Sequence, residues 1–121
     1  NKKNVRIDLL ISSHARRARD TAEILSKGLN YPCEKIEVSR SIYRNDVEDV
    51  LAVIALVPEN ISNLMIVGHN PAFTRLTNLF LKQPIEILPT SGVIEICFEN
   101  VLWADLRKSK SISGNCYFPN Y

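Results

Sequence analysis

The chain has 121 residues, of which 45% are hydrophobic and 23% are charged, and its net charge at pH 7 is +2. This length predicts one domain, residues 1–121, with a single hydrophobic core, and the composition excludes a disordered or fibrous protein. So small a net charge gives no support for nucleic-acid binding, and no apolar stretch reaches the roughly twenty residues that cross a membrane. We therefore expect a cytoplasmic protein that binds neither nucleic acid nor membrane.

The cysteines give no sign of a metal or redox site. The chain has three of them and only two histidines, and no two cysteines form a C-x-x-C pair. We therefore expect no bound metal, and we interpret Cys33, Cys97 and Cys116 as reduced, mostly buried thiols.

The hydrophobic pattern predicts alternating strands and helices. Basic and polar residues fill segment 105–114, which is typical of a solvated loop. The order of elements predicts an α/β fold with three α/β/α layers, a mostly parallel sheet, helices on both faces and an antiparallel strand near the C-terminus. The expected elements are a strand at 7–12, a helix from Ser13 to about 28–32, a strand at 35–39, a helix at 47–57, a strand at 64–67, a helix at 71–81, and strands at 92–99 and 115–118.

The segment GHNP, residues 68–71, joins a predicted strand to a predicted helix. Gly68 permits a tight exit from the strand, Asn70 is a good N-cap, and Pro71 fits the first helical position. His69 would then lie at the carboxyl edge of the sheet, where such folds bind ligands, beside helix amides that favour an anion. The alternative for His69 is a half-buried histidine held by a hydrogen bond.

The segment SSHARRAR, residues 12–19, joins another predicted strand and helix. It places Arg17 in the first or second helical turn, where a guanidinium opposes the helix dipole and so does not serve helix stability. Its planar fork of donors matches a phosphate group. Arg16 and Arg19 point away from Arg17 and are expected to be solvated, and His14 is expected to be structural or solvent-facing.

Together these motifs carry a family resemblance. DLLISSHARRARDTAEIL at 8–25, LMIVGHNPAFT at 64–74 and PTSGVIEICF at 89–98 occur in this order. They resemble the histidine phosphatase superfamily, which has a phosphoglycerate mutase-like fold, and within it the small SixA-like branch of phosphohistidine phosphatases. The resemblance extends over nearly the whole chain.

The resemblance implies a metal-independent phosphatase that needs no cofactor and forms a covalent phosphohistidine intermediate. Arg17 and His69 would be its catalytic and phosphate-binding residues, because both would contact phosphoryl oxygens and stabilise charge in the transition state. Asn70, Ser91 and Gly92 would complete the substrate site, with Thr90 beside them. The expected substrate is a protein that carries phosphohistidine, or a small phosphorylated molecule.

The sequence departs from the family at its nucleophile. Family members begin with a strand that ends in Arg-His-Gly or Arg-His-Ala, whereas no Arg-His pair occurs here, and His14 stands where the family usually has proline. We favour a truncated portion of an ordinary phosphatase over a pseudo-phosphatase that lost its nucleophile and only binds phosphate or phosphoprotein. An unrelated doubly wound domain, such as a signalling receiver, would need an acidic cluster at the strand ends, where this chain has Ser12, Ser13 and His69.

Three carboxylates follow the second predicted strand, where relatives that act on alkyl phosphates present a general acid. Asp46 suits a helix N-cap, and Glu48 and Asp49 suit the first helical turn, so we interpret all three as structural. A site without a dedicated acid fits a labile P–N bond, because imidazole leaves more easily than an alkoxide.

Overall fold

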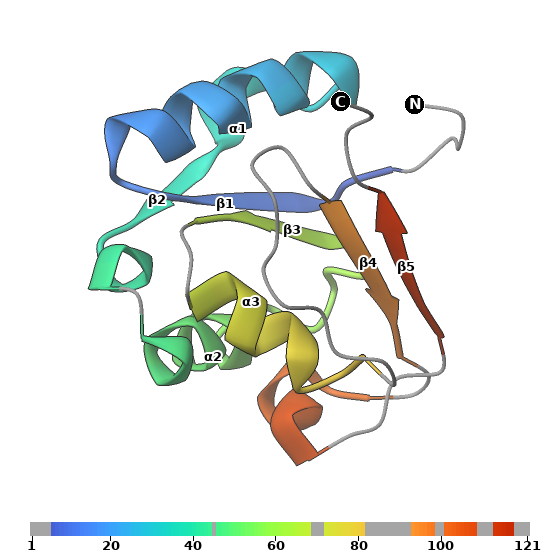
Figure 1. The fold of residues 1–121 in the computed structure, drawn as a ribbon. Helices are drawn as coiled ribbons and strands as arrows, with labels where there is room; N and C mark the ends of the chain where they lie inside the picture. The colour runs from blue at the N-terminus through green and yellow to red at the C-terminus, as the bar shows by residue number, and fades with distance from the viewer. Residues whose placement is uncertain are drawn as a thin grey trace. The chain divides into compact units, whose positions relative to one another are not determined.

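A computed structural model describes residues 6–44, 46–68, 72–81, 93–98, 101–108 and 113–117. These residues belong to two compact units, one with β1, α1, β2 and β3 and the other with α2, α3, β4 and β5 (Figure 1). The elements are β1 (Leu9–Ser13), α1 (Arg16–Gly28), η1 (Cys33–Lys35), β2 (Glu37–Ser39), η2 (Ser41–Arg44), α2 (Val47–Ala55), β3 (Leu64–Val67), α3 (Ala72–Asn78), β4 (Val93–Cys97), η3 (Trp103–Lys108) and β5 (Ser113–Tyr117), where η marks a 3-10 helix.

The first unit contains a three-stranded parallel sheet in the order β2-β1-β3. All five residues of β1 are buried, which fits a central strand of apolar and small residues. At one side of the sheet β2 is short and mostly exposed, as expected of an edge strand. The predicted α/β class and parallel sheet are confirmed.

Helix α1 packs on this sheet through a stripe of small residues. Ala18, Ala22 and Ser26 are buried and recur every four residues, so they share one helix face. Ala22 packs with Leu10 of β1 and with Tyr31, and half-buried apolar side chains surround this cluster. Full burial of a side chain such as Leu10 contributes roughly 1.5–3 kcal/mol to folding.

The beginning of α1 differs from the prediction. The expected cap Ser13 is the last residue of β1, where it pairs with Ser39, and the helix begins at Arg16. The Ser13 hydroxyl still stabilises the turn, because it accepts a hydrogen bond from the Ala15 amide at 3.3 Å. Ser13 therefore belongs to the strand, although the local sequence predicts that it caps the helix.

The end of α1 has the left-handed residue that commonly stops helices. Asn30 has a φ of 57°, and asparagine tolerates this conformation better than most residues. The Tyr31 amide donates to the Ser26 carbonyl at 2.8 Å, and the Asn30 amide donates to the Lys27 carbonyl at 3.4 Å. This Schellman pattern satisfies the last carbonyls of the helix and turns the chain toward η1.

The second unit combines helices with an antiparallel pair of strands. Helix α2 begins as predicted, because Asp46 caps it and accepts a hydrogen bond from the Glu48 amide at 2.9 Å. Helix α2 contacts both α3 and η3. The rings of Phe80 and Phe98 meet edge to face, with centroids 5.1 Å apart. Strands β4 and β5 pair antiparallel, with Val93 opposite Tyr117, as the sequence predicts near the C-terminus.

Two predictions about exposed and buried segments are wrong. The predicted loop 105–114 overlaps η3, where Leu106 is buried, and the first residues of β5. Cys33 is a free thiol as expected, but it is exposed, because it begins η1 at the surface. The side chains of Cys97 and Cys116 lie outside the described residues. Within the described residues, no helix is long and apolar enough to span a membrane.

Candidate functional site

The carboxyl ends of β1, β2 and β3 meet at one edge of the parallel sheet, which we call the carboxyl edge. Ser13 pairs with Ser39, and Ser12 pairs with Val67. The His14 amide donates to the Ser39 carbonyl at 3.2 Å, so β1 and β2 stay paired as the chain leaves the sheet. The segments that follow β1 and β3 therefore begin at neighbouring strands, which is where ligands bind in such folds.

Two buried serines stabilise the end of β1. Ser12 and Ser13 are fully buried, and the Ser12 hydroxyl donates to the Ser13 carbonyl at 2.8 Å. Since the Ser13 hydroxyl accepts from Ala15, the last residues of β1 bond to the turn that leads into α1. These contacts hold the beginning of α1 against the carboxyl edge.

Arg17 is the second residue of α1 and is exposed. This agrees with the predicted position in the first or second helical turn. No acidic residue lies in that turn, and Ala15 supplies no side-chain cap. The beginning of α1 therefore combines a guanidinium with helix amides that Ala15 does not cap, a combination suited to an anion.

The other predicted site residues lie outside the described residues. These are His69, Asn70, Thr90, Ser91 and Gly92. The last described residue before His69 is Gly68, which follows β3 directly and is half-buried. The assignment of these residues to a phosphate site thus stays a prediction, and the same holds for its convergence with Arg17.

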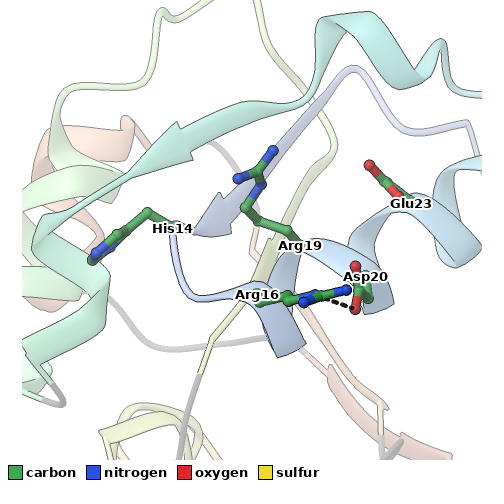
Figure 2. A pocket seen from close by; sticks show the side chains of 5 residues that line it. All are labelled: His14, Arg16, Arg19, Asp20 and Glu23. Carbon is green, nitrogen blue, oxygen red and sulfur yellow. Dashed lines mark ion pairs between the residues drawn. The ribbon is translucent and has the colours of Figure 1, made fainter.

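A hollow of about 260 Å³ lies along a different face of α1 from Arg17. Arg16, Arg19, Asp20 and Glu23 recur at three- and four-residue spacing, so they share one helix face, and His14 adjoins them (Figure 2). Arg17 is rotated about 100° from Arg16 and does not line the hollow.

The side chains of this hollow are mostly solvated, as predicted for its arginines. Arg16 and Arg19 are exposed, and Arg16 Nε lies 4.0 Å from a carboxylate oxygen of Asp20. His14 is half-buried, with Nδ1 shielded from solvent. The sequence interpretation gave His14 a structural or solvent-facing position and did not identify the face shared by residues 16, 19, 20 and 23, which their spacing could have shown.

Comparison with known proteins gave one informative match. No protein-family model and no curated protein matches the chain. A solved structure named "Putative Phosphohistidine Phosphatase SixA" from Nakamurella multipartitia matches with a TM-score of 0.69 at 20% sequence identity. The match covers 95% of this chain and 72% of that chain. The chain has a SixA-like fold.

The carboxylates of α2 have structural positions in this SixA-like fold. Asp46 is the N-cap of α2, and Glu48 and Asp49 lie in its first turn. This agrees with the structural interpretation of all three. Among the described residues, no three histidine, cysteine or acidic side chains gather as they would around a metal ion.

Proposed function

We propose that this chain forms the phosphate-binding part of a metal-independent phosphatase of the histidine phosphatase superfamily, which hydrolyses phosphohistidine in a protein. The observation that carries the proposal is the pairing of β1 with β3. Because of this pairing, the segments that contain Arg17 and His69 follow neighbouring parallel strands and both begin at the carboxyl edge. The SixA-like fold supports the same function.

In this proposal Arg17 binds the phosphoryl group. Its guanidinium donates two parallel hydrogen bonds to two phosphoryl oxygens, and His69 donates a hydrogen bond to the third phosphoryl oxygen. Asn70, Ser91 and Gly92 border the substrate. These roles are transferred from the family resemblance, and the exposed position of Arg17 in the first turn of α1 is compatible with its part.

The proposed reaction has two steps. A histidine nitrogen of the enzyme forms a bond to phosphorus while the bond between phosphorus and the substrate nitrogen breaks, and the leaving substrate imidazole takes a proton from water. Water then attacks the enzyme phosphohistidine and releases inorganic phosphate. Arg17 stabilises the phosphoryl oxygens in both steps. The structural use of Asp46 fits a leaving group that needs no dedicated acid.

A second candidate function is phosphate or phosphoprotein binding without catalysis. One observation favours it: neither His14 nor His69 follows an arginine, so the family's nucleophile motif does not occur in these 121 residues. The same carboxyl edge would then bind the phosphoryl group and leave it intact.

One set of measurements on the full-length protein separates these functions. We expect it to release phosphate faster from a histidine-phosphorylated protein than from sugar phosphates, and the Arg17→Ala variant to lose this activity. Binding of inorganic phosphate without turnover, abolished by the same substitution, would instead support the binding module. Faster turnover of sugar phosphates would contradict the proposed substrate class, and absence of both binding and turnover would contradict both functions.

A further inference from the structure

The end of β1 contains two buried hydroxyl groups that packing does not explain. Ser12 and Ser13 are fully buried, whereas the three residues before them in β1 are apolar. A buried hydroxyl costs stability unless it has a hydrogen-bond partner, so an apolar residue would suit packing at least as well. The Ser12 hydroxyl donates to the Ser13 carbonyl, and the Ser13 hydroxyl accepts from the Ala15 amide. Both bonds therefore serve the turn that follows the strand.

The hydroxyl of Ser13 joins the sheet to the beginning of α1. The backbone of Ser13 is held in the sheet, because it pairs with Ser39 of β2. Its hydroxyl accepts a hydrogen bond at 3.3 Å from the amide of Ala15, the N-cap residue of α1. The carbonyl of Ala15 in turn accepts a helical hydrogen bond from the Arg19 amide at 3.0 Å. A series of hydrogen bonds thus connects the sheet to the first turn of the helix.

The backbone of Arg17 lies between two points that this arrangement fixes. Ala15 precedes it and is bonded to Ser13, and Ala18 follows it and is buried where α1 packs on the sheet. Helices fray most readily at their first turn, and here Ala15 supplies no side-chain cap. The hydroxyl of Ser13 therefore restrains the turn that carries Arg17, in the place of a helix cap.

We propose that Ser13 is a positioning residue, whose hydroxyl fixes the first turn of α1 so that Arg17 meets the phosphoryl group in the geometry of the transition state. This inference rests on the proposed function and adds a residue to the same site. Ser13 is fully buried, so it acts through Arg17 and not on the substrate. A guanidinium that forms two parallel hydrogen bonds depends strongly on its position, since a displacement of about 1 Å costs about 10²-fold in rate.

The test compares Ser13→Ala with a matched substitution one residue earlier, both in the full-length protein. Ser13→Ala should lower kcat for a phosphohistidine protein about 10-fold and raise KM at most about threefold, because a displaced guanidinium still attracts the phosphate charge but loses its paired hydrogen bonds. Ser12→Ala also removes a buried, hydrogen-bonded hydroxyl but leaves the acceptor for Ala15 in place, so kcat should stay within about twofold. Equal losses in the two variants, or an unchanged kcat in Ser13→Ala, would overturn the inference.

A second comparison separates positioning from a general effect on the fold. Because Ser13 acts through Arg17, adding Ser13→Ala to Arg17→Ala should leave the residual kcat/KM of the single variant unchanged within about twofold. A loss as large as in the unsubstituted background would overturn the inference. Ser13→Cys keeps most of the side-chain volume but offers only a weak acceptor, and it should repeat the loss seen in Ser13→Ala. Full activity in Ser13→Cys would count against the hydroxyl. Circular dichroism establishes that each variant is folded at the assay temperature.

Failure of the proposed function gives a different result. If the full-length protein hydrolyses no phosphohistidine, its affinity for inorganic phosphate takes the place of kcat, and Ser13→Ala should weaken this affinity about threefold while Ser12→Ala leaves it unchanged. Equal phosphate affinity in Ser13→Ala and the unsubstituted protein would overturn the inference alone. Unchanged turnover and phosphate affinity in Arg17→Ala would contradict the role of Arg17 in the proposed function, and the inference with it.

Discussion

The two edges of the parallel sheet use charge in different ways. At the amino edge, where β1 begins, the Asp8 carboxylate accepts hydrogen bonds from the Ser62 and Asn63 amides at 3.1 and 3.0 Å. Its other oxygen lies 3.5 Å from Arg6 Nε. At the carboxyl edge, Arg17, Arg19 and Arg40 have no carboxylate partner in the described part of the chain. Charge at the amino edge stabilises the fold, whereas charge at the carboxyl edge is available to a ligand.

Cavity size alone would favour the amino edge over the carboxyl edge. The hollow at the amino edge, which Arg6, Asp8, Tyr31 and Lys35 help to line, has a volume of about 520 Å³, twice that of the hollow along α1. Two of its polar side chains are already used, since Asp8 bonds to two amides and the Tyr31 hydroxyl donates to the Lys35 carbonyl at 2.8 Å. Available hydrogen-bonding groups distinguish a candidate ligand site better than volume does.

The largest expected difference between the edges is in activity. Arg17→Ala should lower kcat/KM of the full-length protein on phosphohistidine about 10²–10³-fold, because it removes a cation that stabilises the transition state. Arg6→Ala removes another exposed arginine, at the amino edge, and should change kcat/KM less than about twofold. Steady-state kinetics on both variants checks the comparison, and similar losses in the two would contradict it.

For folding stability we expect the larger effect at the amino edge. Asp8→Ala removes the acceptor for two backbone amides and should lower the free energy of unfolding by about 1–3 kcal/mol. Asp20→Ala, at the carboxyl edge, removes only an exposed ion pair and should cost at most about 0.5 kcal/mol. Urea denaturation monitored by circular dichroism measures both. A larger loss in Asp20→Ala would show that the carboxyl edge also depends on its charges for folding.

A smaller loss of stability is expected when Ser13, which connects β1 to α1, is substituted. Ser13→Ala removes the acceptor for the Ala15 amide and should cost about 1 kcal/mol, comparable to the loss of a helix cap. Amide hydrogen exchange at Ala15 should accelerate in parallel. Ser62→Ala removes an exposed hydroxyl and serves as the control, with no change in exchange at Ala15. Unchanged exchange in Ser13→Ala would mean that β1 pairing alone fixes this turn.

Local sequence signals predicted most of the elements. Strand β3 has its predicted bounds, and α2 begins at its predicted residue, because Asp46 gives a cap and an apolar run gives the strand. The start of α1 was displaced because Ser13 pairs with Ser39, a contact between residues far apart in the sequence. The 3-10 helices were not predicted, since turns this short leave no periodic pattern.

The candidate site was predictable to a smaller extent. The type and approximate position of Arg17 follow from residue chemistry and helical spacing. That β1 lies between β2 and β3, so that its carboxyl end adjoins both, depends on the strand order of the whole unit. His14 was interpreted as structural or solvent-facing, and its half-buried position with an amide bonded to the Ser39 carbonyl depends on a strand with which it shares no local motif.

The strand order β2-β1-β3 also has a consequence for synthesis of the protein on the ribosome. The first unit is interrupted in the sequence by α2, which belongs to the second unit. A nascent chain that has emerged as far as Ala55 contains β1 and β2 but not β3, so one side of the apolar strand β1 is still unpaired. Parallel strands with distant partners form slowly and expose apolar surface in the meantime. Strand β1 is thus made well before its partner β3 and stays unpaired on that side until β3 emerges, which makes β1 a segment that a ribosome-associated chaperone would bind.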